Sequence, residues 1–425
     1  MLQHTEPNPR LLALQRKALI VGVIGIVVLL GGSLISGGIA GFFQSYLYGF
    51  LFWNGLALGC LSALMLHHMV AGRWGFMIQR ILEAGARNLR FTAILILPVL
   101  LFGMKYLYPW MPNAVENVLG AEALHHGHQK AEGLIIPYLN ISWYNQGFFI
   151  VRAAIYYVVW IFLMMRLTGL SQRLDQTGDQ TIIGRFRGIS APGLVIYVIT
   201  MTFAACDWGM SLEPEWFSTI YGPLYIVGQG LGTLAFSVII LNKIADDKPH
   251  APVIKIDYFH HIGSLMTGFV VLWTYIQFSQ FLITYSGNLP EEIPWYLHRQ
   301  GNFFAIISVL LMVFHFFLPL FILLQRRVKR ARRGLLFMAK WILIARFTDV
   351  FWIIVPAFHH QGEGYGPLVF VMNVAALAGI GGLWVYMFVR NIHKHALLPL
   401  NDDRKNESLG IGPFAAHQEA AEHVV

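Results

Sequence analysis

The chain has 425 residues, of which 56% are hydrophobic and 12% are charged, with a formal net charge of +8. Soluble domains average about 25% charged residues, so this composition excludes an ordinary soluble protein. The positive charge lies between apolar segments, which indicates contact with anionic lipid rather than with nucleic acid, and the two cysteines form no CxxC pair that would suggest a metal site.

Ten apolar segments are each long enough to cross a bilayer, which takes about 20 helical residues. The first of them, 18–36, is apolar on all sides rather than along one stripe, as expected for a membrane helix and not for a soluble helical core. We predict that it is an uncleaved anchor, because it is longer than the apolar part of a signal peptide. In chain order the predicted helices cover about 18–36, 42–66, 88–108, 145–165, 190–210, 218–241, 260–285, 301–324, 338–358 and 366–389.

Positively charged residues fall in every second gap between these segments. Those gaps hold twenty-five of the 30 Lys and Arg. Of the other five, Lys130 lies in an intervening gap, and Lys105, Arg152, Arg299 and Arg346 lie within or at the border of predicted helices. Such alternation is the positive-inside bias of a multi-pass protein. We therefore predict an all-α polytopic membrane protein with ten transmembrane helices over 18–390. A cytoplasmic N-terminus, 1–17, and a cytoplasmic tail, 391–425, complete the chain.

The connections between helices are short. The longest predicted outer connection, 109–144, contains an amphipathic stretch at Ala114–Glu132, and 69–90 and 166–189 are predicted to be cytoplasmic loops. None of them is large enough for a catalytic domain. Any chemistry is therefore expected between the helices or in a partner subunit.

The 17 histidines raise the question of a metal or haem site. The histidines near the predicted helices lack the spacing that two haems stacked between the same two helices require. His125, His126 and His128 resemble a metal motif, but they lie in a loop without a matching partner motif. We predict no metal site and no cofactor held by the chain itself.

Ionisable residues inside a membrane indicate function by default. Arg346 and Asp349 lie three residues apart on one face of a predicted helix. With a rise of about 1.5 Å per residue, they lie about 12 and 16 Å from the inner boundary, and His315 on the neighbouring helix lies about 9 Å from it. The three form a candidate proton path, together with Arg152 and Gln229; a purely structural Arg–Asp pair is the alternative. Of the other two cations near the membrane, Lys105 and Arg299, we expect snorkelling toward the surface.

Two short outer loops, 207–221 and 286–296, combine Trp, Tyr, Pro and acidic residues. Trp and Tyr at a membrane boundary often serve as interfacial anchors. The acidic residues beside them favour a docking surface for a peripheral subunit. The candidate docking residues are Asp207, Glu213, Glu215, Glu291 and Glu292.

Four stretches carry a resemblance to a known family. FLFWNGLALG (50–59), SWYNQGFFIVRAAIYYVVW (142–160), DWGMSLEPEWFSTIYG (207–222) and FSQFLITYSGNLPEEIPWY (278–296) resemble the NrfD-like, or polysulphide-reductase-type, membrane subunits. They are most similar to the second such subunit of bacterial alternative complex III, a quinol:cytochrome c oxidoreductase. The resemblance covers about 40–390.

The resemblance implies two four-helix bundles with two peripheral helices, in the bacterial cytoplasmic membrane. It also implies a subunit without a redox cofactor of its own. The quinol, the iron–sulphur clusters and the haems c would be bound by partners. These partners would be a sister NrfD-like subunit, a periplasmic iron–sulphur protein, a multihaem cytochrome c and other small membrane subunits.

One departure from the family bears on quinol binding. Quinol-binding sister subunits carry a His in the second helix, where this chain has Leu58. We therefore expect an accessory subunit that supports quinol oxidation by its partners and conducts protons. Two alternatives remain, namely an independent secondary transporter and the quinol-binding subunit itself. In the latter, the missing His would be replaced from a set of polar residues: Gln44, Tyr46, Asn54, Gln277 and Gln280.

Overall fold

The computed structural model describes residues 8–35, 37–119, 121–133, 135–136, 141–247, 254–290, 292–358, 366–399 and 401–402. In these ranges ten helical spans are long and apolar enough to cross a membrane. The number of spans agrees with the prediction from sequence, and the protein is a multi-pass membrane protein.

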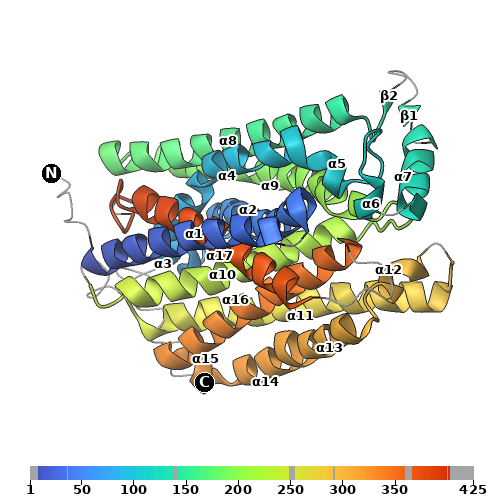
Figure 1. Cartoon of the computed structure of the whole chain (residues 1–425). Coiled ribbons are helices and arrows are strands. Elements are labelled where there is room, and N and C mark those ends of the chain that lie inside the picture. The colour runs from blue at the N-terminus through green and yellow to red at the C-terminus, as the bar shows by residue number, and fades with distance from the viewer. Residues whose placement is uncertain are drawn as a thin grey trace.

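The helices follow one another with short connections (Figure 1). Spans three, five, eight and nine are each built from two or more segments, and in spans three and eight one segment is a π-helix. The elements are α1 (Pro9–Ile35), α2 (Gly38–Val70), α3 (Arg73–Arg87), α4 (Leu89–Leu95), π-helix η1 (Val99–Gly103), α5 (Met104–Leu107), α6 (Glu116–Leu119), α7 (Ala121–Gly133), β1 (Ile135–Ile136), β2 (Ile141–Ser142), α8 (Gln146–Thr177), α9 (Thr181–Trp208), 3-10 helix η2 (Met210–Leu212), α10 (Tyr221–Ile244), α11 (Ile256–Gly287), α12 (Ile293–Leu297), α13 (Asn302–Leu311), π-helix η3 (Met312–Phe317), α14 (Leu318–Leu324), α15 (Arg326–Arg330), α16 (Arg332–Ile354), 3-10 helix η4 (Val355–Phe358) and α17 (Pro367–Ile392).

Helices α2 and α10 lie side by side at the centre and are buried along most of their length. Around them, α2 contacts α3, α9 and α17, while α10 contacts α9, α11 and α16. The two central helices therefore separate the α8–α9 side of the molecule from the side formed by α11, α13, α14 and α16. A charged side chain at the centre of the molecule therefore packs against α2 or α10.

Helix α1 packs along α17 in the opposite direction. Glycines allow this contact: a Cβ on Gly22 would lie 2.9 Å from the backbone nitrogen of Leu383, which is too close for any larger residue. Near the start of α1, Gln15 donates to the carbonyl of Tyr386 at 3.5 Å. The two ends of the described chain thus lie at the same end of the molecule, which we call the terminal end.

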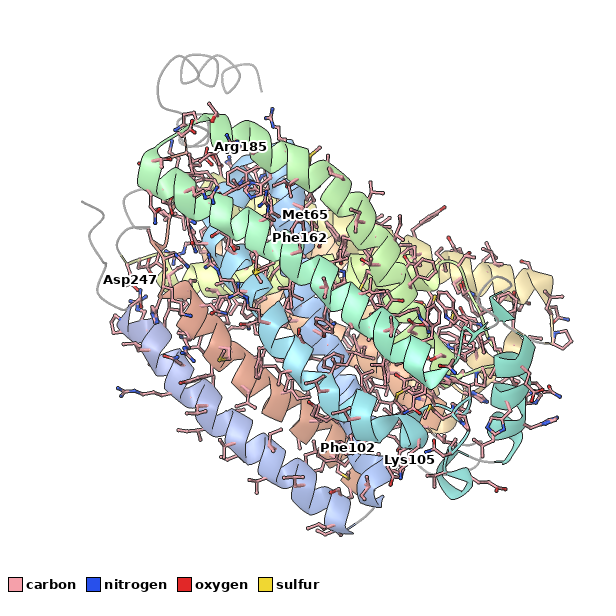
Figure 2. The ribbon with its side chains drawn as sticks, turned by 90° about the horizontal axis from the view of Figure 1, so that it is seen from above. Met65, Phe102, Lys105, Phe162, Arg185 and Asp247 are labelled. Atoms are coloured by element: carbon pink, nitrogen blue, oxygen red, sulfur yellow. The ribbon has the colours of Figure 1, made fainter. Side chains whose placement is uncertain are left out.

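The opposite end carries α7, α12 and the antiparallel pair β1–β2, and we call it the α12 end (Figure 1). Figure 2 places Arg185 and Asp247 toward the terminal end and Lys105 toward the α12 end. The amphipathic stretch predicted at Ala114–Glu132 coincides with α6 and α7.

Two segments predicted to be loops are helical instead. The range 69–90 contains α3, so the third span begins at Trp74 rather than near 88. The range 166–189 is occupied by the end of α8 and the start of α9, with a turn at Gly178 whose φ of 68° favours glycine. Both predictions were wrong because the charged residues were interpreted as a loop. In the structure these residues belong to α3, α8 and α9, which continue beyond their apolar parts.

Candidate functional site

The main candidate site surrounds Asp349, which is fully buried on α16. Its carboxylate forms an ion pair with the guanidinium of Arg346, one helical turn earlier. From α11, Trp273 Nε1 donates to Asp349 Oδ2 at 3.2 Å, and Gln277 Nε2 lies 3.5 Å from Oδ1. The structure thus confirms the predicted Arg346–Asp349 pair and adds two partners from α11 that sequence reasoning did not connect with it.

The position of Arg346 depends on a glycine of the central helix α10. A Cβ on Gly228 would overlap the Nη2 and Cζ atoms of Arg346, so only glycine leaves room for the guanidinium against that helix. Arg346 itself is 4% exposed. A buried guanidinium is stable only when it is paired. Asp349, on the same helix, supplies the negative charge that pairs with it.

His315 lies close to this pair. It belongs to η3, and its ring packs edge-on against the ring of Trp273 with 3.9 Å between centroids. The side chain is fully buried, and within the described part of the chain neither ring nitrogen has a hydrogen-bond partner. π-Helical turns occur often at functional sites. The predicted grouping of His315, Arg346 and Asp349 is therefore present, with Trp273 between the imidazole and the carboxylate.

The other predicted members of the proton path lie elsewhere. Gln229 is the neighbour of Gly228 but faces the other side of α10, where Tyr197 donates to its Oε1 at 2.6 Å and Met201 Sδ lies 3.4 Å from its Nε2. The amide of Gln229 therefore joins α10 to α9. It does not contact the Asp349 cluster.

Arg152 forms a separate buried pair with Asp207. Its Nε and Nη2 donate to the two carboxylate oxygens at 2.9 and 2.8 Å, and its Nη1 donates to the carbonyl of Trp143 at 2.8 Å. Tyr156 adds a bond to Asp207 at 2.8 Å, and the ring of Trp143 lies 4.1 Å from the guanidinium carbon. Asp207 was predicted to lie on a docking surface, but it is only 1% exposed. Its carboxylate joins α9 to α8.

Arg299 and Glu213 form a second buried pair at the α12 end. Arg299 Nη2 donates to Glu213 Oε2 at 2.8 Å, Nη1 reaches Oε1 at 3.2 Å, and His298 Nδ1 lies 2.8 Å from Oε1. Burial raises the pKa of Glu213, but the charges of Arg299 and His298 outweigh it and hold that pKa below its ordinary value. Arg299 is 2% exposed and does not snorkel as expected. Glu213 therefore anchors the loop before α10 to α12.

The remaining docking candidates differ in position. Glu215 is half-buried and its carboxylate lies 3.1 Å from Nε2 of His126 on α7. Glu292 is half-buried at the start of α12, and Glu291 lies outside the described residues. In the described part of the chain, no group of three His, Cys, Asp or Glu side chains is arranged to hold a metal ion.

The polar residues proposed to replace a quinone-binding His are divided between two helices. On α2, Tyr46 donates to the carbonyl of Leu95 at 2.7 Å, Asn54 accepts from Tyr157 at 2.9 Å, and Gln44 is half-buried. These contacts join α2 to its own neighbours. On α11, the two glutamines point in different directions.

Of the two, Gln277 reaches Asp349, whereas Gln280 accepts from Ser218 at 2.5 Å and bonds Thr284 at 3.3 Å. Central helix α10 contacts both α2 and α11. The five residues therefore do not form one site.

A further polar network was missed by the sequence reasoning. Arg80 on α3 donates from Nη1 to Glu83 at 2.9 Å and to Ser171 of α8 at 2.7 Å, and its Nη2 bonds Asp175. Arg80 and Glu83 are 3% and 1% exposed. The signal was available, because Arg80 and Glu83 lie three residues apart on a face that repeats with helical period. Their charge caused 69–90 to be predicted as a loop.

These networks differ in what they can do chemically. The Arg152, Arg299 and Arg80 pairs each join separate helices through several fixed hydrogen bonds, which is the arrangement of a structural link. The Asp349 cluster differs, because an imidazole without a hydrogen-bond partner among the described residues packs on Trp273, which in turn bonds the carboxylate. Neither the models of known protein families nor the characterised proteins contain a match to this chain.

Proposed function

We propose that this chain is an accessory membrane subunit of a bacterial quinol:cytochrome c oxidoreductase of the alternative complex III type, and that it conducts protons through Asp349 and His315. The observation that carries the proton role is the Asp349 cluster. It places a carboxylate, its arginine partner and an imidazole that has no hydrogen-bond partner in the described ranges together inside the membrane-spanning part of the molecule. Ionisable groups at such depth are costly and are found chiefly where ions or protons move.

Membership of the NrfD-like family is supported by the four resembling stretches and by how three of them meet. Arg152 of the second stretch pairs with Asp207 of the third. The third and fourth also touch, since Trp216 stacks on Trp295 with 4.6 Å between ring centroids and Ser218 bonds Gln280. Together they build the α12 end. In this proposal that end faces the periplasm, and the terminal end faces the cytoplasm.

The helix contacts are compatible with the bundle arrangement that the family implies. One bundle would contain the spans from α2 to α9, the other those from α10 to α16, and α1 and α17 would be peripheral. The partners would be a sister NrfD-like subunit, an iron–sulphur protein and a multihaem cytochrome c docked at the α12 end. Oxidation of quinol by those partners would release the two protons and two electrons of each quinol.

In the proposed proton path, the carboxylate of Asp349 accepts and releases a proton as its pairing with Arg346 changes. Trp273 and Gln277 hold the carboxylate in place through the bonds at 3.2 and 3.5 Å. His315 packs on the other side of Trp273 and supplies the second titratable group. Imidazole is suited to this role because it can accept a proton at one ring nitrogen and release one from the other.

The test uses the intact complex reconstituted in vesicles, with protons translocated per electron as the readout. Asp349→Asn keeps the size of the side chain but cannot ionise. We expect it to lower proton translocation while quinol oxidation continues near the wild-type rate. Asp207→Asn is the matched control, because it also removes a buried, arginine-paired carboxylate. If the assembled Asp349→Asn complex translocates as many protons per electron as the wild type, the proton role is wrong and Arg346–Asp349 is a structural pair.

A further inference from the structure

A strongly basic pocket lies at the terminal end, in the connection between the eighth and ninth spans, where α15 joins α14 to α16 (Figure 1). Its place at that end follows from Asp246, which bonds Arg332 directly after this connection and also lies 3.9 Å from Arg10 near the start of α1. The pocket has a volume of about 390 Å³ and is lined by Arg326, Arg327, Arg330 and Ala331. Three guanidinium groups therefore surround one small space.

The pocket holds more positive charge than its neighbours neutralise. Arg330 Nη2 donates to Asp257 Oδ1 of α11 at 3.0 Å. In the described part of the chain Arg326 and Arg327 form no ion pair, and both are exposed. Like charges held close together repel each other, and an anion that contacts several of them relieves the repulsion. Arginine is especially suited to phosphate, because its planar guanidinium offers two parallel donors to two oxygens.

The pocket also lies where two membrane-spanning helices end. The eighth span ends at Leu324 and the ninth begins at Arg332, so the lining arginines stand at the boundary of the apolar layer. Phe317, Phe321 and Leu324 are 42%, 61% and 59% exposed and repeat with helical spacing. They form one exposed apolar stripe along α14 that leads to the pocket. A soluble anion would use the arginines but not this stripe, whereas a lipid would use both.

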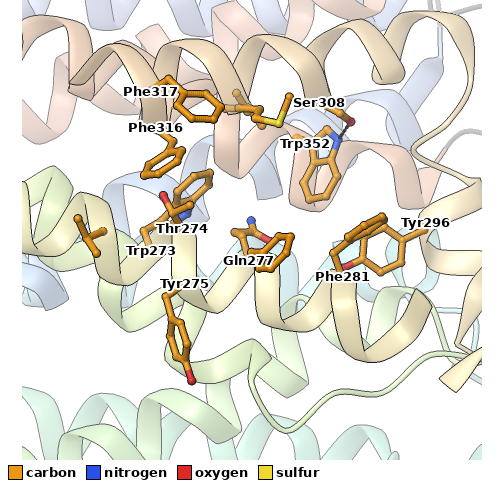
Figure 3. Close-up of a pocket in the computed structure, with 14 residues that line it drawn as sticks. Trp273, Thr274, Tyr275, Gln277, Phe281, Tyr296, Ser308, Phe316, Phe317 and Trp352 are labelled. Atoms are coloured by element: carbon orange, nitrogen blue, oxygen red, sulfur yellow. Dashed lines mark hydrogen bonds between the residues drawn. The ribbon is translucent and has the colours of Figure 1, made fainter. Parts of the chain in front are cut away.

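At its other end the stripe reaches an apolar cavity between α11 and the helix formed by α13, η3 and α14. Phe316 and Phe317 form part of the wall of this cavity (Figure 3). Phe317 lies nine residues before Arg326, or about 13 Å along a helix that rises about 1.5 Å per residue. One leaflet holds about 15 Å of hydrocarbon, half of a core of about 30 Å. An acyl chain whose phosphate is bound by the arginines is therefore long enough to reach the cavity at Phe317.

We propose that the arginine pocket binds the phosphate of an anionic phospholipid, of the phosphatidylglycerol class, with one acyl chain along the stripe on α14. Cations spread over several loops attract anionic lipid only diffusely, whereas a basic pocket between membrane helices binds a single head group. Arg326 and Arg327 would contact the phosphate oxygens, and Arg330 would divide its donors between the phosphate and Asp257. The proposal is independent of the proposed function, because it requires neither a partner subunit nor proton movement.

Binding is tested on the full-length chain in detergent, with short-chain phosphatidylglycerol as the probe and native mass spectrometry as the readout. Saturable binding is expected, and phosphatidylcholine of the same chain length should bind more weakly because its ammonium group is repelled by the arginines. The double variant Arg326→Gln/Arg327→Gln should weaken phosphatidylglycerol binding about 25-fold, since each arginine contributes about fivefold. The matched control is Arg185→Gln/Arg187→Gln, because these two arginines are also exposed toward the terminal end but lie on α9, outside the pocket. The affinity of this control should equal that of the wild type.

Asp257→Asn changes the affinity in the opposite direction, which a misfolded variant would not do. Loss of this carboxylate frees Arg330 for the phosphate, so phosphatidylglycerol should bind about fivefold more tightly. Unchanged or weaker binding would contradict the proposal.

Three other results would also overturn it. Equal affinities for the wild type and the Arg326/Arg327 variant would show that the pocket is not the site, and an equal loss in the Arg185/Arg187 control would show that the attraction is diffuse. Displacement of the lipid by millimolar inorganic phosphate would make the pocket a site for soluble anions. Because the readout is lipid affinity, a failed binding test leaves the proton test of Asp349 unaffected, and the reverse is also true.

Discussion

Four buried arginines show how the same side chain serves different purposes. Arg80, Arg152 and Arg299 each bond a carboxylate or carbonyl from another segment. They hold helices together. Arg346 instead pairs with a carboxylate on its own helix and packs on Gly228 of α10, while the bonds to α11 are made by Asp349 and not by the guanidinium. A guanidinium that bonds no second helix adds little to helix register, so a buried charge of this kind inside the membrane favours a functional explanation.

The Arg152–Asp207 pair should be important for stability. Asp207→Asn leaves a buried guanidinium without its counter-charge, which costs about 3–5 kcal/mol. We expect a marked fall in the midpoint of thermal unfolding in detergent. The matched control is Asp257→Asn, because the Arg330–Asp257 pair is 45% and 38% exposed and such pairs contribute below about 1 kcal/mol. Similar midpoints for both variants would show that Asp207 is not a structural link.

The Glu213–Arg299 pair predicts a dependence of stability on pH. The pKa of Glu213 is lower in the folded protein than in the unfolded chain, where it is about 4.3. Its contribution is therefore present above that value and is lost as the pH falls through the folded pKa. We would measure the midpoint of thermal unfolding from pH 7 to pH 3. The wild-type midpoint should be higher than that of Glu213→Gln at neutral pH, and the two midpoints should converge in acid. A gap that stays constant would argue against the linkage.

Sequence reasoning at the residue scale found charges but not all their partners. Arg346 and Asp349 were predicted to pair because they share a helical face. The Arg152–Asp207 pair joins residues 55 positions apart, which helical spacing cannot show. Trp273 gave no signal either, since an indole in an apolar helix looks like any other lipid-facing or core side chain. It was the fold that brought it between His315 and Asp349.

At the scale of elements, close contact between α1 and α17 depends on small residues. A Cβ on Gly25 would overlap the backbone of Gly379, so Gly25→Val must separate the two helices. Overpacking of this kind costs about 1–3 kcal/mol. The unfolding midpoint should fall for Gly25→Val and stay unchanged for Gly31→Val, whose Cβ would meet nothing within 4 Å. A fall of equal size in Gly31→Val would mean that valine itself, rather than the contact, disturbs α1.

Helix boundaries were harder to predict than helix number. Hydropathy located each span because the bilayer sets the length of its apolar part. It missed α3, where Arg80 and Glu83 neutralise each other and are buried with Ser171. It also missed η1 and η3, since a π-helical turn changes the backbone without changing composition. Such turns re-aim side chains, and η3 turns His315 toward Trp273.

On the scale of the whole molecule, the two ends differ in charge: cations gather toward the terminal end and the acidic docking candidates toward the α12 end. Most cations lie in gaps that the sequence predicts to be cytoplasmic, and the two described chain ends lie together at the terminal end. The second observation is what an even number of crossings requires. The first predicts, but does not show, that the terminal end faces the cytoplasm. The predicted acidic docking surface at the α12 end is smaller than expected, because Asp207 and Glu213 are used within the fold. Glu215 and Glu292 remain as candidates for contact with a peripheral subunit.

The central claim is that this chain works inside a quinol-oxidising complex, and purification from native membranes tests it most directly. An affinity tag on the chain, expressed at its natural level and extracted in mild detergent, should bring down partners. We predict a preparation with the absorbance of haem c and the electron paramagnetic resonance of iron–sulphur clusters, able to pass electrons from quinol to cytochrome c. A chain that purifies alone or only with copies of itself, free of haem and iron, would contradict the account and favour a transporter.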